Sequence, residues 1–418
     1  MAVTHDAFKH TSLLRQALDN PKMPIAFLLG AGCPLSILTA GKPLIPDIAG
    51  MTKEIVIRLE ASALKDAFGL IKEQMVVSGG APPNIEEYLG HVRNLIEVAK
   101  KVAIGGLNKD TLNALDMEMC NEVVVISEAK LPNLSTPYHY LASWIRGTPR
   151  IIPIEVFTTN YDLLMEQALE DLRVPYFDGF IGSRAAFFDP YAIESIESQE
   201  GKLPSRWARL WKLHGSINWW SQNNDEAAEV VRTTKDKAGV CRLIHPSHLK
   251  YDESRKMPYL AMMDRLKTFL AKPRAVLVIC GYSFRDVHIN SLVLQALAGN
   301  QNSIVFGLLF GELKQYQAAI DLARSSPNLC LIAEDAAVIG TRKAPWDTKS
   351  KSSFGDIPFV GIIPNTPKAG EVDEDKPVPV KVTLGDFSQL GGLLQELIGS
   401  SQTDKTGSVT AAEEGHAT

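Results

Sequence analysis

Polar residues that could do chemistry follow four apolar segments of this sequence. They form the stretches GAGC at 30–33, TTNYD at 158–162, HGS at 214–216 and GYSFRD at 281–286. The apolar segments are typical of strands that are buried on both faces of a parallel sheet. Because ligands of such sheets bind beyond the carboxyl ends of the strands, the four polar ends together predict one site at one rim of a sheet.

The glycine pair of the first stretch permits two interpretations. Without side chains at Gly30 and Gly32, the backbone could approach a phosphate, whose charge the N–H groups at a helix start would bind. A tight turn with glycine at positive φ is the alternative. Pro34 falls where a phosphate-binding helix would begin, so the stretch alone does not decide between them.

The other three stretches carry side chains that could act on a substrate. Asn160 could hold a water or a ribose hydroxyl while Asp162 fixes the loop, although Asn and Asp also commonly end strands. His214 could accept a proton near neutral pH; a histidine hydrogen-bonded within the core is the alternative. Gly281 and Ser283 could donate hydrogen bonds to a phosphate or ribose, or could simply form a turn from strand to helix.

Strands that alternate with helices must position these stretches. The alternation predicts an α/β fold, a Rossmann-like doubly wound parallel sheet with a large helical insertion or subdomain. The insertion covers about 50–148, where Asn84 and Glu87 form a capping-box pattern. In RLWKLHGSINWW the strand is predicted to end at His-Gly. In GYSFRD, Asp286 is placed to cap the helix that is predicted to follow this stretch.

The residue composition of the chain changes near residue 340. Residues 1–340 are predicted to form one catalytic domain that includes the helical subdomain. Residues 341–418 form a C-terminal segment rich in proline and charge. We expect linker or exposed loop there, a short helix over DFSQLGGLLQELIGS and a disordered tail.

Composition narrows the class of protein. The chain has 418 residues and a formal charge of −5, which argues against nucleic-acid binding over the whole surface. Its five cysteines have no CxxC spacing, so neither a disulfide framework nor a zinc ribbon is expected. The N-terminus is polar, and no apolar run approaches membrane-spanning length. We therefore expect a cytoplasmic protein with no membrane contact, no direct nucleic-acid contact and no metal.

The four stretches, in this order, resemble the motifs of the sirtuin superfamily over about residues 25–340. In that family a GAGxS loop holds the dinucleotide phosphates and an IPDF segment helps to close the nicotinamide pocket. GAGCPLS and IPD at 45–47 match these motifs in part. The resemblance implies a sirtuin-like NAD-binding domain whose first cofactor contacts are Gly30, Ala31, Gly32, Cys33, Pro46 and Asp47.

The later motifs are similar as well. TTNYD looks like the family's TQN-hydrophobic-Asp motif, which places its asparagine on Asn160 and its aspartate on Asp162, while the family's His-Gly maps onto His214 and Gly215. The resemblance implies catalytic roles for Asn160, His214 and Asp162. It implies further cofactor contacts at Thr159, Tyr161, Gly281, Tyr282, Ser283 and Asp286.

The motif sequences TTNYD … LHGS … GYSxxD are closer to those of bacterial sirtuin-like NAD hydrolases of antiphage defence than to those of deacetylases. In length and layout the chain is similar to the subunit that works with a HerA-like hexameric ATPase. Sirtuin deacetylases carry a four-cysteine zinc module and peptide-binding features that this sequence lacks. The resemblance therefore implies a homo-oligomeric NAD⁺ glycohydrolase that releases ADP-ribose and nicotinamide and depletes cellular NAD in abortive infection.

In this interpretation Asn160 positions a water and a ribose hydroxyl, His214 is the general base and Asp162 orients the loop. Backbone amides of the GAGC loop hold the phosphates, and Cys33 is a small packing residue. A protein deacylase or ADP-ribosyltransferase shares the cofactor site. A module that senses NAD⁺ or ADP-ribose without turnover, or a scaffold subunit, is a non-catalytic alternative. No acidic residue at a strand end selects between NAD⁺ and NADP⁺.

Overall fold

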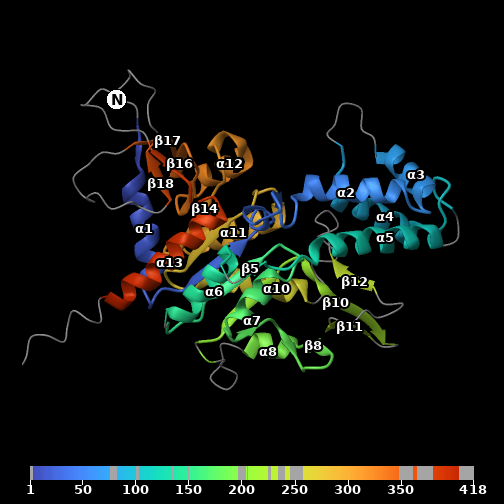
Figure 1. The fold of residues 1–418 in the computed structure, drawn as a ribbon, viewed down its shortest axis with the longest axis horizontal. Helices are drawn as coiled ribbons and strands as arrows, with labels where there is room; N and C mark the ends of the chain where they lie inside the picture. Colours follow the sequence, from blue (N-terminus) through green and yellow to red (C-terminus); the bar gives the residue numbers. More distant parts are fainter. Residues whose placement is uncertain are drawn as a thin grey trace, which may run out of the picture.

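A ten-stranded sheet forms the centre of the protein, in the order β1-β17-β16-β15-β14-β13-β2-β5-β9-β6 (Figure 1). The computed structural model describes residues 3–75, 82–99, 103–132, 135–148, 150–195, 204, 206–224, 227–233, 241–244, 258–347, 361–364 and 380–403. The strands of the sheet are β1 (His5–Asp6), β2 (Ile25–Leu29), β5 (Glu155–Thr158), β6 (Tyr176–Phe177), β9 (Ala208–Lys212), β13 (Val276–Cys280), β14 (Ile304–Leu308), β15 (Leu329–Ile332), β16 (Ala336–Ile339) and β17 (Arg342–Asp347).

The sheet is doubly wound, as the sequence predicts. From β9 through β5, β2, β13 and β14 to β15, each strand runs parallel to its neighbour. Numbered along the chain, this order is 3-2-1-4-5-6, the order of dinucleotide-binding Rossmann sheets. The chain therefore reverses its direction of winding between β2 and β13.

Two apolar cores lie against opposite faces of the sheet, because successive side chains of a strand point to opposite faces. In β2, Phe27 and Leu29 join one core while Ala26 and Leu28 join the other. The first core includes side chains from α1 (Ala7–Asp19), α6 (Pro137–Gly147), α7 (Leu164–Asp171) and α13 (Phe387–Thr403). The second includes side chains from α10 (Tyr259–Ala271), α11 (Val287–Gly299) and α12 (Gln317–Ser325).

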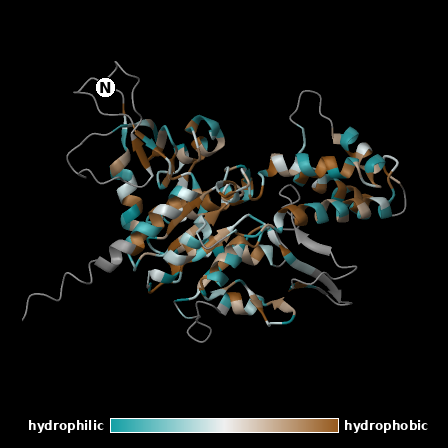
Figure 2. Ribbon diagram, in the orientation of Figure 1, coloured by the Kyte–Doolittle hydropathy of each residue, from teal (hydrophilic) through white to brown (hydrophobic). Residues whose placement is uncertain are grey.

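A helical lobe projects from the sheet, formed by α2 (Ile48–Glu60), α3 (Lys65–Met75), α4 (Ile85–Val98) and α5 (Lys109–Ser127) (Figures 1 and 2). The predicted capping box starts α4: Asn84 Oδ1 accepts from Glu87 N at 3.0 Å, and Glu87 Oε2 accepts from Asn84 N at 2.7 Å. The sequence grouped 50–148 as one helical region, but its last helix, α6, lies on the sheet. The reason is the apolar face of α6, whose Trp144 packs edge-on against Phe27 with ring centroids 5.6 Å apart.

A second, antiparallel sheet is formed by strands that lie in the chain between β6 and β13, and no sequence pattern predicted it. Its order is β12-β10-β11-β8-β7, with β7 (Phe180–Ile181), β8 (Ala186–Phe188), β10 (Gly215–Asn224), β11 (Ala227–Arg232) and β12 (Cys241–Ile244). A short helix, α8 (Pro190–Ser195), follows β8. The predicted strand is β9, which ends at Lys212, two residues before His214, and β10 begins at Gly215 itself.

The C-terminal segment continues the main sheet across residue 340. β16 and β17 form a hairpin across that position and extend the main sheet. The predicted helix is α13, whose leucines, Leu390 and Leu393 among them, are buried in the core that also contains α6. A small hairpin of β18 (Ile362–Pro364) and β19 (Val380–Val382) precedes it. Most of the expected linker lies outside the described residues. The disordered tail was expected from residue 401, but α13 continues to Thr403, and residues 404–418 lie outside the described residues.

None of the helices in the part of the chain that the structure describes is both long and apolar enough to cross a membrane. Within the same ranges, no group of three or more His, Cys, Asp or Glu side chains is arranged to hold a metal ion.

Candidate functional site

The four polar stretches meet at one rim of the sheet. Their strands β13, β2, β5 and β9 are direct neighbours in that order and all run parallel. Their carboxyl ends therefore lie side by side, which confirms the sequence prediction. The GAGC and GYSFRD stretches flank the point between β2 and β13 where the winding reverses, the place where open α/β sheets bind ligands.

The loops after β2 and β13 touch backbone to backbone. Gly30 N donates to Cys280 O at 2.9 Å, and Gly32 N donates to Gly281 O at 2.8 Å. A Cβ atom on Gly30 would lie 2.4 Å from Gly281 O, and Gly281 itself has a φ of +68°. The glycines are therefore needed for the close approach of these two loops and for the turn at 281, whatever ligand binds there.

The backbone amides of the GAGC loop are largely used within the protein. The amides of Gly30 and Gly32 donate as described, and Cys33 N donates to Gly30 O at 3.0 Å, which closes a turn. Ala31 is exposed, and its N–H has no acceptor among the described residues. A short 3₁₀ turn, Pro34–Ser36, follows in place of a helix, so the helix start of the phosphate interpretation is missing.

Cys33 is a packing residue in this structure. Its side chain is fully buried, and its Sγ lies 3.3 Å from Cys280 O, to which it donates. Burial raises the pKa of the Cys33 thiol well above its ordinary value, which disfavours the thiolate that a nucleophile needs.

Asn160 joins the TTNYD stretch to the GAGC loop. Its Nδ2 donates to Gly30 O at 3.1 Å, and its backbone N donates to Thr158 Oγ1 at 3.0 Å. The neighbouring Thr159 donates from its backbone N to Leu29 O at 3.1 Å. The side chain of Asn160 is thus buried at the rim with its amide nitrogen already engaged, which leaves its carbonyl oxygen as an acceptor.

Asp162 is buried beneath the loop and holds it in place. Its Oδ1 accepts from Leu164 N at 3.0 Å at the start of α7. The side chain of Lys212 is only 2% exposed; its Nζ donates to the backbone oxygen of Asp162 and, at 2.9 Å, to Glu166 Oε1. Burial raises the pKa of Asp162 to about 6, while the positive charge of Lys212 opposes the shift. Lys212 was not among the predicted site residues, although a lysine at the end of an apolar strand indicates a buried charge with a partner.

His214 and Asp286 form a hydrogen-bonded pair across the rim. His214 Nε2 and Asp286 Oδ2 are 3.0 Å apart, and the two side chains are 11% and 6% exposed. The other carboxylate oxygen of Asp286 caps α11, where it accepts from His288 N at 2.9 Å. The predicted cap is therefore confirmed, but the same carboxylate also orients the histidine. This pairing joins residues 72 positions apart and left no local signal in the sequence.

The remaining predicted residues have partners on several different elements. Tyr282 is buried and its hydroxyl donates to Asn290 Oδ1 at 3.0 Å, whereas Ser283 is exposed. Asp47 is exposed and its Oδ1 accepts from Gly50 N at 2.8 Å to start α2; Pro46 precedes it, half-buried. Tyr161 reaches the helical lobe, where its hydroxyl donates to Glu86 Oε1 on α4 at 3.0 Å.

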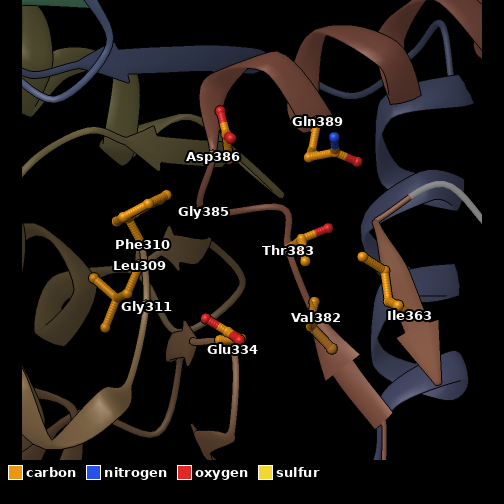
Figure 3. Close-up of a pocket in the computed structure, with 10 residues that line it drawn as sticks. All are labelled: Leu309, Phe310, Gly311, Glu334, Ile363, Val382, Thr383, Gly385, Asp386 and Gln389. Carbon is orange, nitrogen blue, oxygen red and sulfur yellow. The ribbon is translucent and has the colours of Figure 1, made fainter. Parts of the chain in front are cut away.

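A pocket of about 150 Å³ opens at the same rim, beyond the ends of β14 and β15 (Figure 3). Its lining residues are Leu309, Phe310, Gly311, Glu334, Ile363, Val382, Thr383, Gly385, Asp386 and Gln389. Figure 3 shows Leu309 and Phe310 on the wall opposite Val382 and Thr383. Cys280 Sγ lies 3.7 Å from Gly385 O, so the pocket adjoins the end of β13. The sequence did not reveal the pocket because six of its ten lining residues come from the C-terminal segment.

Residues 154–322 match the family model of a SIR2-like domain. The match includes TTNYD, HGS and GYSFRD and ends before the C-terminal segment. No curated protein matches the chain.

Solved structures of sirtuins are similar to this chain at low identity. A Sir2 homologue in complex with NAD is 14% identical, with 76% of this chain and 89% of that chain covered and a TM-score of 0.34. A structure on the mechanism and regulation of Sir2 enzymes is 13% identical, with 71% and 83% covered and a TM-score of 0.33.

Proposed function

We propose that this protein is an NAD⁺ glycohydrolase. The observation that supports it most is the meeting of Asn160, the His214–Asp286 pair and the GAGC loop at the switch point of a doubly wound sheet. A dinucleotide is the ligand that such switch points take. The SIR2-like match of residues 154–322 supports NAD⁺ as that dinucleotide.

In the proposed complex the dinucleotide lies along the rim. The exposed N–H of Ala31 is the amide of the GAGC loop that is left to meet a phosphate, and Ser283 offers a hydroxyl on the neighbouring loop. The adenosine ribose enters the pocket beyond β14, where Asp386 and Glu334, the latter paired with Lys381, provide carboxylates. Carboxylates accept hydrogen bonds from ribose hydroxyls and repel a 2′-phosphate, so NAD⁺ is preferred over NADP⁺.

The reaction needs one water and one base. Loss of nicotinamide from C1′ leaves a cation-like sugar, as in glycoside hydrolysis. The Asn160 carbonyl oxygen accepts from a ribose hydroxyl or the attacking water, and His214 takes the proton that the water loses as its oxygen bonds to C1′. Asp286 holds the imidazole and stabilises its protonated form. Asp162 is buried and bonded to its own loop, so its part is to keep Asn160 in place.

Replacement of Asn160 or His214 by alanine tests the proposal. Purified protein is incubated with NAD⁺, and nicotinamide release is followed. Each substitution should lower the rate on the order of 10²-fold or more, while His91→Ala, in the helical lobe, should leave it unchanged. Folded variants that keep the wild-type rate would overturn the proposal. Release of ADP-ribose without any acceptor protein separates hydrolysis from deacylation and ADP-ribosyl transfer.

The biological role belongs to the same proposal. The motif sequences are similar to those of bacterial defence enzymes, and this similarity supports depletion of cytoplasmic NAD in abortive infection. We propose that the active form is a homo-oligomer that works with a HerA-like ATPase. Light scattering of the protein with and without that ATPase, together with nicotinamide release from the mixture, tests it. A monomer whose rate the ATPase leaves unchanged would contradict this part alone.

A further inference from the structure

A hydrogen bond joins the helical lobe to the TTNYD stretch. Tyr161, between Asn160 and Asp162, donates from its hydroxyl to Glu86 Oε1 at 3.0 Å. Glu86 lies in the first turn of α4, and both side chains are half-buried. Burial raises the pKa of Tyr161 well above its ordinary value, and the nearby charge of Glu86 raises it further. The hydroxyl therefore keeps its proton and stays the donor of this bond.

The backbone of Tyr161 contacts the stretch that contains His214. The carbonyl oxygen of Tyr161 accepts from Ile217 N at 3.1 Å and from Ser216 Oγ at 3.4 Å. Ser216 is fully buried and lies two residues after His214. Tyr161 is thus bonded to the lobe by its side chain and to the His214 stretch by its carbonyl group, and it follows Asn160 directly in the chain.

The helix that contains Glu86 is fixed within the lobe. At its start, Ile85 N donates to Thr52 Oγ1 of α2 at 2.9 Å. Two turns later, Arg93 Nε donates to Asp116 Oδ1 of α5 at 2.6 Å, and these two side chains are 16% and 19% exposed. Because α4 is bonded to two neighbouring helices, the lobe as a whole determines where Glu86 lies.

We propose that Glu86 is a positioning residue, whose bond to Tyr161 makes the geometry of the Asn160 loop depend on the helical lobe. The inference rests on the proposed function of Asn160 and His214, and Glu86 acts through Tyr161 rather than on the substrate. The alternative is that Glu86 only stabilises the start of α4 by its charge. The alternative requires the negative charge, whereas the bond to Tyr161 requires only an acceptor oxygen.

Three substitutions separate these roles. Glu86→Ala removes the acceptor and should lower kcat for nicotinamide release about three- to tenfold, the equivalent of one net hydrogen bond, with KM for NAD⁺ changed less than kcat. Glu86→Gln loses the charge but keeps an acceptor oxygen, so its kcat should return to within about twofold of the wild-type value. Tyr161→Phe removes the donor, and the addition of Glu86→Ala to it should lower kcat no further.

Amide hydrogen exchange measures the effect on the loop without any turnover. In Glu86→Ala, the amides of residues 159–164 should exchange about three times faster than in the wild type, or more, because the loop opens locally more often. Glu122→Gln is the matched control. It weakens a 2.6 Å pair with Arg58 inside the lobe, and it should change neither kcat nor exchange in residues 159–164.

A folded Glu86→Ala protein with the wild-type kcat would overturn the inference while the proposed function stands, and so would a Glu86→Gln protein that loses as much. If the wild-type protein releases no nicotinamide, the proposed function fails instead, and the exchange rates decide the inference. Equal rates in residues 159–164 of the wild type and of Glu86→Ala overturn it, and faster exchange in the variant supports it.

Discussion

A single methyl group at Gly30 would collide with the neighbouring loop. Its Cβ would lie 2.4 Å from Gly281 O, a backbone atom that cannot move without its strand. Gly30→Ala should therefore lower the free energy of unfolding by about 1–3 kcal/mol, as measured by denaturant titration. Gly69→Ala is the control, since nothing lies within 4 Å of a Cβ there in helix α3. That variant should gain roughly 0.5–1 kcal/mol, and equal losses in both would contradict the packing argument.

Asp162 should weaken the fold as the pH rises. Burial raises its pKa from 3.8 to about 6 in the folded protein, so the folded state holds the proton more tightly than the unfolded chain. The contribution of Asp162 to stability is complete below its unfolded pKa and is lost as the pH rises through the folded value. Such a shift amounts to roughly 3 kcal/mol.

Unfolding free energies of the wild type and of Asp162→Asn, compared between about pH 4 and pH 7, measure this effect. The stability of the wild type relative to the variant should fall across that interval. A difference that stays flat would mean that Asp162 titrates at its ordinary pKa.

At the scale of elements, α13 should behave as part of the core. Leu393 is fully buried, and its helix contacts α6 directly. Leu393→Ala should cost about 2–5 kcal/mol of unfolding free energy. Leu13→Ala, at an exposed position of α1, should cost less than about 0.5 kcal/mol. Similar melting temperatures for the two variants would show that α13 is dispensable.

Elements whose signals are local could be predicted from the sequence. The caps at Asn84 and Asp286 were visible because a cap and its partners lie within three residues. The shared rim followed from strand alternation alone. Contacts between residues that are distant in the chain could not be predicted. The leucine pattern of α13 predicted a short helix, but no pattern indicated that this helix packs beside α6. The same holds for the His214–Asp286 pair and for the antiparallel sheet, whose strands lie on both sides of β9 in the chain.

At the scale of the whole molecule, the proposed ligand spans segments that are far apart in the chain. Its pocket combines Glu334 from beyond β15 with Asp386 before α13. If the adenosine ribose lies there, NADP⁺ should bind roughly tenfold or more weakly than NAD⁺, because a 2′-phosphate meets the carboxylate of Asp386. Glu334 pairs with Lys381 at 2.5 Å, so Glu334→Gln leaves the Lys381 ammonium without that partner and should narrow the difference between the two dissociation constants.

Titration of both dinucleotides into Asn160→Ala protein, which avoids turnover, measures that difference. Glu312→Gln is the matched control, since Glu312 is near the rim but pairs with Lys314 and does not line the pocket. Equal affinities for NAD⁺ and NADP⁺ in the parent protein would place the adenosine end elsewhere.

The position of β2 also bears on how the protein is made. β2 is completed at residue 29, yet its two partners in the sheet arrive with residues 155 and 276. β1 must wait still longer, because it pairs with β17 at residues 346 and 347. A growing chain therefore carries an apolar strand with open edges through most of its synthesis, a template for wrong pairing. Early translational arrest should thus yield insoluble fragments. Refolding of the whole chain is expected to be slow, because its strands pair with strands far away in the sequence.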